Sequence, residues 1–167
     1  MNYSKICDLE IKGKRIVIKD SMIMLSTNED TPEWPFVTVE NGKYEVQALE
    51  DADPYSATRI IKSGMSAVRG KKIGDVEVDH AGVGIIDYDS FLSVVKKNYD
   101  EYSNWTSMAL DDFIWDQVSG KIDFLKESLV FLHSGDGDGT YPVYELLHNN
   151  NVVGLECDFL VEIEELN

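Results

Sequence analysis

Short runs in which apolar and polar residues alternate follow one another along most of this 167-residue chain. A period of two is that of a β-strand with one buried and one exposed face. Turn signals separate the runs: Gly13-Lys14 divides the first run into two strands, and Asn41-Gly42 predicts a two-residue hairpin. The pattern predicts strands within residues 6–25, 36–49, 57–65, 74–87, 129–133, 140–147 and 152–165.

The period changes to that of a helix in two segments of the second half. In residues 89–102 apolar side chains recur every three or four positions, and Asp89 precedes them as an N-cap. Residues 107–120 repeat this spacing and end at Gly120, a residue that suits the position just after a helix. Both segments therefore predict helices.

The order of these elements predicts an α+β fold, a predominantly antiparallel sheet with about two helices in the second half. No long linker and no repeat interrupts the chain, so we expect residues 1–167 to form a single domain. A seam, if there is one, is expected near residue 88, between a β-rich N-terminal part and an acidic α+β C-terminal part.

Neither end of the chain predicts a special compartment. The first dozen residues mix charges, unlike a secretory signal, and no apolar run reaches the ~20 residues of a membrane helix. We therefore expect a cytoplasmic protein, in the host cytoplasm if it is phage-encoded. Cys7 and Cys157 have no metal-type spacing, and they could pair only if the fold brought the two ends of the chain together.

The net charge of −16 is distributed unevenly. Residues 1–97 contain 13 Lys and Arg against 16 Asp and Glu, whereas residues 98–167 contain only Lys121 and Lys126 against 15 acidic residues. A direct nucleic-acid ligand is disfavoured, because phosphate binding needs a basic surface. Plain solubility would explain a high negative charge, but the near absence of cations in the last 70 residues favours a partner protein with a basic surface.

The last predicted strand carries the most regular acidic pattern. Its apolar residues fall at every second position from Val153 to Ile163, and the residues between them are mostly Glu and Asp, which we expect to face solvent. The second predicted helix adds an acidic outer face. The residues predicted to bind a partner are Asp111, Asp112, Trp115, Asp116, Glu156, Asp158, Glu162, Glu164 and Glu165.

The glycine-rich segment 135–140 raises the question of metal chemistry. Asp136 and Asp138 match the D-x-D-G-T box of haloacid-dehalogenase-type phosphotransferases, whose aspartates serve as nucleophile and general acid and hold Mg²⁺. That class of enzyme requires an alternating βαβ series after the box, and no such series follows here. We interpret the segment as a tight connection between strands, with glycines at positive φ and aspartates bonded to the backbone. A Mg²⁺-dependent phosphotransferase using Asp136 and Asp138 is the alternative.

Other patterns do not support catalysis either. No established set of metal ligands is matched by the spacing of Asp75, Asp79, His80 and Asp87. Asp79 and Asp87 are explained by their positions at the ends of predicted strands. The chain contains no nucleophile elbow and no P-loop. We therefore predict a protein without enzymatic activity, metal or cofactor.

Two segments carry a resemblance to a known family. Residues 137–144, followed by a turn at 149–151 and then "VVGLECDF", resemble the C-terminal signature of an uncharacterised family of small bacterial and phage domains with a GDG-x-YPVY motif. Residues 76–91 resemble the upstream segment of that family, with His80-Ala81 where the family prefers Ser before Gly. The resemblance covers about half of the chain and implies a shared β-rich fold without an assigned activity.

The expected function is binding and inhibition of a partner enzyme. In size and acidity the chain resembles small phage-encoded inhibitors of host enzymes, such as Lon protease inhibitors, and immunity proteins that neutralise nuclease toxins. Carboxylates would steer the encounter with a basic surface, and exposed aromatics (Trp34, Trp105 or Trp115) would anchor it. A DNA-mimicking inhibitor of a nucleic-acid enzyme is a second alternative beside the phosphotransferase.

Overall fold

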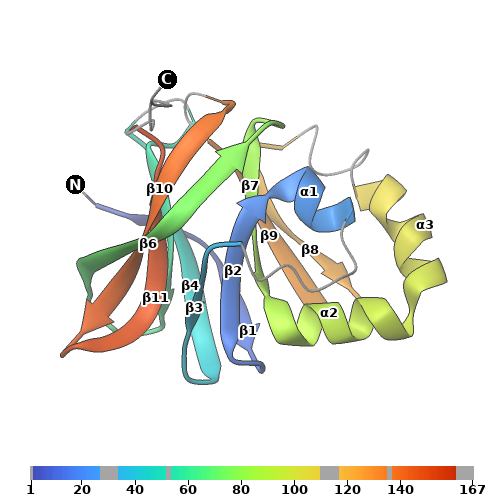
Figure 1. Ribbon diagram of the computed structural model, residues 1–167, viewed down its shortest axis with the longest axis horizontal. Coiled ribbons are helices and arrows are strands. Elements are labelled where there is room, and N and C mark those ends of the chain that lie inside the picture. Colours follow the sequence, from blue (N-terminus) through green and yellow to red (C-terminus); the bar gives the residue numbers. More distant parts are fainter. Residues whose placement is uncertain (1, 27–33, 52–53, 110–116, 135–136, 161–167) are drawn as a thin grey trace.

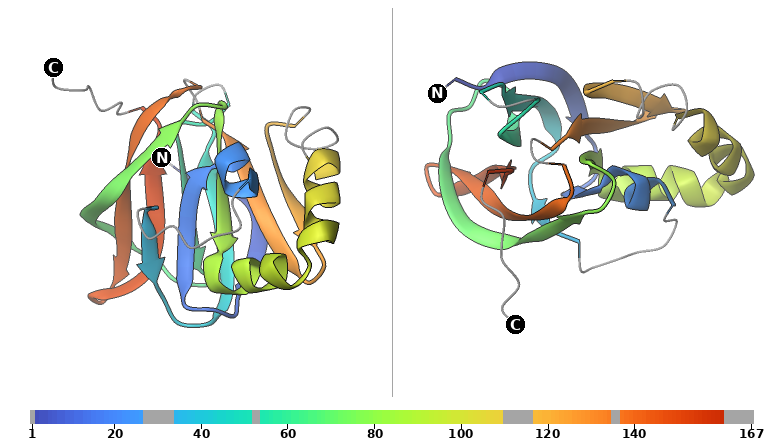
Figure 2. Two further views of the ribbon diagram at one scale, coloured as in Figure 1. Left: turned by 45° about the vertical axis from the view of Figure 1, so that its right-hand side comes forward. Right: turned by 90° about the horizontal axis from the view of Figure 1, so that it is seen from above.

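The computed structural model describes residues 2–26, 34–51, 54–109, 117–134 and 137–160, in which two antiparallel sheets and three helices are stacked in layers (Figure 1). The helices lie on the side of the five-stranded sheet that faces away from the six-stranded sheet (Figure 2). The α+β class is confirmed: the sheet pairing is antiparallel, and the two longer helices lie in the second half of the chain.

The six-stranded sheet has the order β1-β4-β5-β11-β10-β6. Its strands are β1 (Ser4–Ile11), β4 (Gly42–Leu49), β5 (Ala57–Lys62), β11 (Asn151–Asp158), β10 (Gly139–His148) and β6 (Val68–Val78). Strand β11 is an interior strand, paired with β5 on one side and β10 on the other. Strands β10 and β11 form a hairpin, and the predicted turn between them is confirmed by the positive φ angles of Asn149 and Asn150.

The five-stranded sheet has the order β3-β2-β7-β9-β8. Its strands are β3 (Phe36–Thr38), β2 (Arg15–Asp20), β7 (Gly82–Asp87), β9 (Glu127–His133) and β8 (Ser119–Phe124). Every residue of β7 is buried, because this sheet is covered on both faces. Strands from both sides of residue 88 contribute to each sheet.

Among the described strands the chain crosses from one sheet to the other four times, and two of these connections, β1 to β2 and β3 to β4, lie side by side (Figure 1). The predicted hairpin at Asn41-Gly42 is therefore wrong: β3 pairs with β2, while β4, which begins at Gly42, pairs with β1 and β5. Local turn chemistry marks the end of a strand correctly here, but it does not determine which strand becomes the partner.

Two apolar cores hold these layers together. The larger core lies between the sheets and contains alternate residues of both, such as Val46 and Leu155 from one sheet and Ile18 and Ile85 from the other, all essentially inaccessible to solvent. The second core lies between the five-stranded sheet and the helices. At about 25 cal/mol per Å² of buried apolar area, burial of this kind is the main favourable contribution to folding.

The helices are α1 (Ser21–Ser26), α2 (Tyr88–Lys97) and α3 (Tyr99–Ala109). The first predicted helix is divided between α2 and α3, which separate at Asn98. The second predicted helix, at 107–120, is partly wrong: its beginning belongs to α3, residues 110–116 lie outside the described residues, and Ser119 and Gly120 open strand β8. None of the described helices has the length and apolar character needed to cross a membrane.

Candidate functional site

Helix α3 is attached to the molecule by a cluster of aromatic rings. Tyr102 stacks on Trp105 with ring centroids 5.6 Å apart and meets Phe91 and Phe124 edge-on at 6.0 and 5.2 Å. The hydroxyl of Tyr102 donates a hydrogen bond to the carbonyl oxygen of Leu25 at 2.7 Å. Aromatic pairs of this kind add about 0.5–1.5 kcal/mol each beyond simple burial. The helix is therefore held rigidly on its inner side.

The outer side of α3 is acidic and partly apolar. Asp100 and Glu101 are exposed in its first turn, and neither has a cationic partner among the described residues. Tyr99 and Met108 are 51% and 49% exposed, large values for apolar side chains. The helix contains no Lys or Arg. We call the four residues Tyr99, Asp100, Glu101 and Met108 the α3 surface; helix α3 lies at the end of the molecule remote from the six-stranded sheet (Figure 1).

Most of the residues predicted to bind a partner lie outside the described residues. These are Asp111, Asp112, Trp115 and Asp116, which follow α3 in the chain, and Glu162, Glu164 and Glu165 near the C-terminus.

Glu156 corrects the prediction of a solvent-facing row of carboxylates on the last strand. It is only 7% exposed, accepts a hydrogen bond from the Tyr3 hydroxyl at 2.7 Å, and accepts another from Arg69 Nε at 2.7 Å. Burial and the bond to Glu156 raise the pKa of Tyr3 well above its usual value. The partners of Glu156 come from the two edges of the sheet, since Tyr3 precedes edge strand β1 and Arg69 lies on edge strand β6.

Asp158 is also less available than predicted. Its side chain is 17% exposed and forms an ion pair with Arg69 at 3.5 Å. The Arg69 guanidinium lies over the ring of Tyr144 at 4.2 Å, and Arg59 lies over Tyr3 at 3.9 Å. This face of the six-stranded sheet is therefore a closed network of charges and rings, so the acidic pattern of the last strand is matched by cations from β5 and β6.

Two tryptophans predicted as exposed anchors are not exposed. Trp34 is 9% exposed and packs edge-on against Tyr88 in the second core, with ring centroids 6.2 Å apart. Trp105 is partly buried in the aromatic cluster under α3. A tryptophan is the largest apolar side chain available to a core, and the helical layer uses both of these for packing. On α3 itself, the large apolar side chains that are exposed are Tyr99 and Met108.

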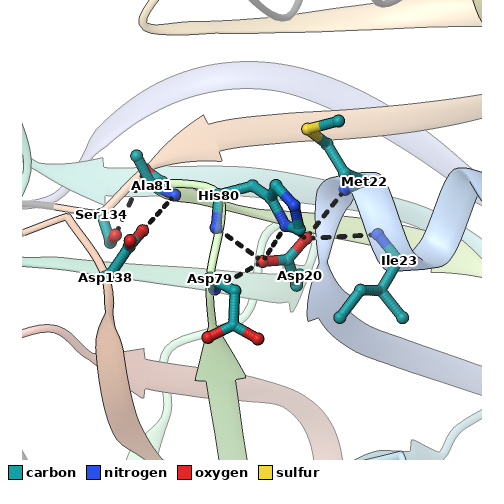
Figure 3. A network of polar contacts seen from close by, with 8 residues as sticks. All are labelled: Asp20, Met22, Ile23, Asp79, His80, Ala81, Ser134 and Asp138. Carbon is teal, nitrogen blue, oxygen red and sulfur yellow. Dashed lines mark hydrogen bonds and ion pairs between the residues drawn. The ribbon is translucent and has the colours of Figure 1, made fainter.

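The glycine–aspartate segment is a structural connection where it is described. Gly137 has a φ of +79°, and the Asp138 carboxylate accepts a hydrogen bond from the backbone N–H of Ala81 at 2.8 Å (Figure 3). The hydroxyls of Ser134 and Tyr141 both donate to the carbonyl oxygen of Gly137. The turn interpretation is thus confirmed for Gly137 and Asp138, while Asp136 lies outside the described residues. The connection passes from β9 in one sheet to β10 in the other.

Asp20 is the polar centre of this region that sequence reasoning missed. Its carboxylate is inaccessible to solvent and accepts four backbone N–H bonds, from Met22, Ile23, Asp79 and His80, at 2.7–3.2 Å (Figure 3). The Nδ1 atom of His80 lies 3.2 Å from it. An aspartate directly before a short helix is an N-cap signal, and Asp20-Ser21 could have been recognised in this way. Its contacts with the β6–β7 turn could not.

The arrangement around Asp20 is suited to structure more than to chemistry. A buried aspartate that orients a histidine occurs in catalytic triads, but these also need a nucleophile in contact with the histidine. No such contact is found for His80 among the described residues. Within the same residues no three His, Cys, Asp or Glu side chains are placed to hold a metal ion.

Comparison with known protein families, curated proteins and solved structures finds no match for this chain. The two segments that resemble the GDG-x-YPVY family meet in the structure, through the bond from Ala81 N to Asp138 and through the antiparallel pairing of residues 139–141 with residues 76–78. Their contact makes them one structural unit at the end of the two sheets. The relationship to that family stays a prediction.

Proposed function

We propose that this protein is a non-enzymatic inhibitor that binds a partner enzyme through the α3 surface. The observation that supports this most directly is the combination, on one rigid helix, of two exposed carboxylates with two half-exposed apolar side chains and no cation. Protein interfaces use apolar and aromatic residues as anchors and complementary charges to steer the encounter. The partner therefore presents Lys and Arg beside an apolar depression.

The nature of the partner follows from its charge. A groove rich in Lys and Arg is typical of enzymes that handle acidic or nucleic-acid substrates, and the general likeness to phage-encoded inhibitors favours an ATP-dependent protease or a nuclease. The acidic residues at 111, 112 and 116 follow α3 in the chain and lie outside the described residues. Glu156 and Asp158 do not belong to it, because Arg69 already neutralises them.

The phosphotransferase alternative gains no support. It needs both aspartates of the segment to face a metal, yet Asp138 accepts a backbone hydrogen bond from Ala81. It also needs a parallel sheet with alternating helices, whereas the sheets here are antiparallel. The DNA-mimic alternative differs from the main proposal only in the partner's natural ligand, and it becomes an outcome of the test.

The test compares three forms of the protein as bait in bacterial lysate at low and at high salt. The forms are the wild type, the double variant Asp100→Lys/Glu101→Lys, and the control Glu77→Lys, which changes an exposed charge on β6. We expect one protein to be retained by the wild type and the control but lost from the double variant. Its association rate should fall about tenfold or more between low and high salt.

The retained protein is then purified and its activity assayed with each form. Inhibition by the wild type and Glu77→Lys, and none by the double variant, supports the proposal. Displacement of the inhibitor by duplex DNA would identify the partner as a nucleic-acid enzyme. Equal retention by all three forms, or a retained protein whose activity does not change, would refute the α3 surface as an inhibitory site.

A further inference from the structure

A groove of about 470 Å³ lies beside the β1–β2 and β3–β4 connections, and three of the residues that line it are cationic. It is lined by Lys12, Gly13, Lys14, Arg15, Thr38, Asn41 and Asp89, that is, three cations and one carboxylate in a chain of net charge −16. The β1–β2 and β3–β4 connections form its walls and are joined by a hydrogen bond from Val39 N to the carbonyl oxygen of Lys14 at 2.9 Å.

Two carboxylates hold the β1–β2 connection in place. The Asp87 carboxylate accepts the N–H bonds of Lys12 and Gly13 at 2.7 and 3.0 Å, and the Asp89 carboxylate accepts those of Lys14 and Arg15 at 3.4 and 3.2 Å. Four consecutive backbone amides are therefore fixed. A side chain at position 13 would not fit, because its Cβ would lie 2.6 Å from Asp87 Oδ1. The cations project from a preorganised loop, which lowers the entropic cost of binding a ligand.

The cations of the groove differ in what they already bind. Lys12 Nζ pairs with Glu127 at 2.8 Å, and Arg15 pairs with Asp89 at 2.7 Å while its guanidinium lies over the ring of Tyr88 at 4.8 Å. Lys14 is exposed, and its ammonium group has no partner among the described residues. The groove therefore contains one uncommitted cation, with two others oriented beside it.

Two neutral donors complete the groove. The hydroxyl of Thr38 and the side-chain amide of Asn41 line the groove, and neither has a hydrogen-bond partner among the described residues. An ammonium, a hydroxyl and an amide around one space are the donors that a tetrahedral oxyanion accepts.

We propose that this groove binds the phosphate group of a small molecule, with Lys14 as its principal ligand-binding residue and Thr38 and Asn41 as hydrogen-bond donors. Arg15 and Lys12 flank the site from positions that their ion pairs with Asp89 and Glu127 fix. This site is separate from the α3 surface, so it goes beyond the proposed inhibitory function and does not depend on it.

The test is a titration of the full-length protein with inorganic pyrophosphate at low ionic strength. Binding is measured by calorimetry and by changes in the backbone amide NMR signals. We expect saturable binding that shifts the signals of Gly13, Lys14 and Asn41. Lys14→Ala should weaken the affinity for pyrophosphate about tenfold, because it removes one charge-assisted hydrogen bond. Lys97→Ala, which removes an exposed lysine at the end of α2, is the matched control and should leave the affinity unchanged.

Acetate and inorganic phosphate serve as further probes. Binding of phosphate and pyrophosphate without acetate supports a phosphate site, whereas equal binding of all three anions would reduce the groove to a general anion site and overturn the proposal. Equal weakening by Lys14→Ala and Lys97→Ala, or no saturable binding of pyrophosphate, would also overturn it. Unchanged amide spectra of the variants elsewhere show that they remain folded.

Discussion

At the scale of single residues, the Asp20 carboxylate joins two segments of the chain from a fully buried position. It is fully buried, and its charge is balanced by four N–H dipoles and the His80 ring instead of a Lys or Arg. A buried charge is tolerable only when hydrogen bonds replace its lost hydration. The bonds join the start of α1 to the β6–β7 turn, so that one side chain connects segments about sixty residues apart in sequence.

We expect Asp20→Asn to lower the free energy of unfolding by about 3 kcal/mol, because the amide N–H₂ would face backbone donors and leave them unsatisfied. Urea unfolding at neutral pH measures this change. Asp79→Asn is the matched control: its exposed carboxylate has no partner among the described residues, so it should change stability by no more than about 0.5 kcal/mol. Equal effects of the two substitutions would show that the Asp20 network does not support the fold.

The ionisation of Asp89 makes the stability of the fold depend on pH. Its hydrogen bonds from Arg15, with those from the backbone of Lys14 and Arg15, lower the pKa of its carboxyl group despite an opposing effect of burial. A lowered pKa in the folded state means that the ionised form stabilises the fold. This contribution is complete above the ordinary aspartate pKa of about 3.9 and is lost as the pH falls through the lower pKa of the folded state.

Asp89→Asn should therefore be less stable than the wild type at neutral pH, by about 1 kcal/mol for a partly exposed charged pair. The difference should shrink steadily once the pH falls below about 4. Thermal unfolding of both proteins between pH 2 and pH 7 provides the measurement. A stability difference that stays constant over this range would contradict the assigned role of the ionised Asp89.

At the scale of elements, strand β11 contains Gly154, a position with no room for a side chain. A Cβ on Gly154 would lie 1.8 Å from the backbone oxygen of Ile60 in the neighbouring strand β5. Backbone on the partner strand cannot move away without breaking the ladder between β5 and β11. The close approach occurs in an interior strand, where neighbours on both sides prevent relaxation.

Gly154→Ala is expected to destabilise the protein by about 3 kcal/mol or more, a value typical of overpacking against rigid surroundings. Gly74→Ala is the control on edge strand β6, where the nearest atom, Pro35 Cγ, is 3.4 Å from the added Cβ. That substitution should change stability by less than about 1 kcal/mol. Comparison of the two urea midpoints decides the matter, and a Gly154→Ala variant as stable as Gly74→Ala would disprove the close packing of β5 and β11.

At the scale of the whole molecule, the fold keeps the two cysteines apart. Both are free, in β1 and β11, which are separated by β4 and β5. Three strand spacings correspond to about 14 Å, too far for a disulfide. Burial is the main cause that raises the pKa of Cys7 to about 11, and burial also raises the pKa of the fully buried Cys157 well above its usual value.

Thiol labelling at pH 8 should therefore be slow at Cys7, whose thiolate fraction is about a hundredfold below that of an ordinary thiol. Labelling of Cys157 should wait for global unfolding, because its place between the sheets opens only when they separate. The single variants Cys7→Ser and Cys157→Ser allow each rate to be followed alone. Rapid labelling of Cys157 in native conditions would show that the two sheets open locally.

Much of the secondary structure could be predicted because it depends on local patterns. The alternation in β11, the short apolar runs of β5 and β9 and the turn at Asn149-Asn150 depend on neighbours in the chain, and the structure contains them. Strand β8 was missed because its short segment follows a stretch of helical spacing. The Asn41-Gly42 turn was misassigned because a turn residue marks where a strand ends and not where its partner lies.

The candidate sites were predictable only in part, and Glu156 shows why. The sequence predicts its place on the polar face of a strand, but its exposure depends on Tyr3 and Arg69, which are distant in the chain. The groove at Lys14 likewise needs two crossing connections and the carboxylates of Asp87 and Asp89. Nothing in the local pattern of those residues indicates that they meet.

The sequence by itself determined the α+β class, most of the strands, and the accumulation of negative charge in the last 70 residues, because these depend on composition and on short-range periodicity. The tertiary structure alone decided which strands pair, which carboxylates are neutralised, and that Lys14 has no ionic partner among the described residues. The physical reason is that burial and electrostatic pairing arise between residues far apart in the chain, and only the packing of the two sheets brings those residues together.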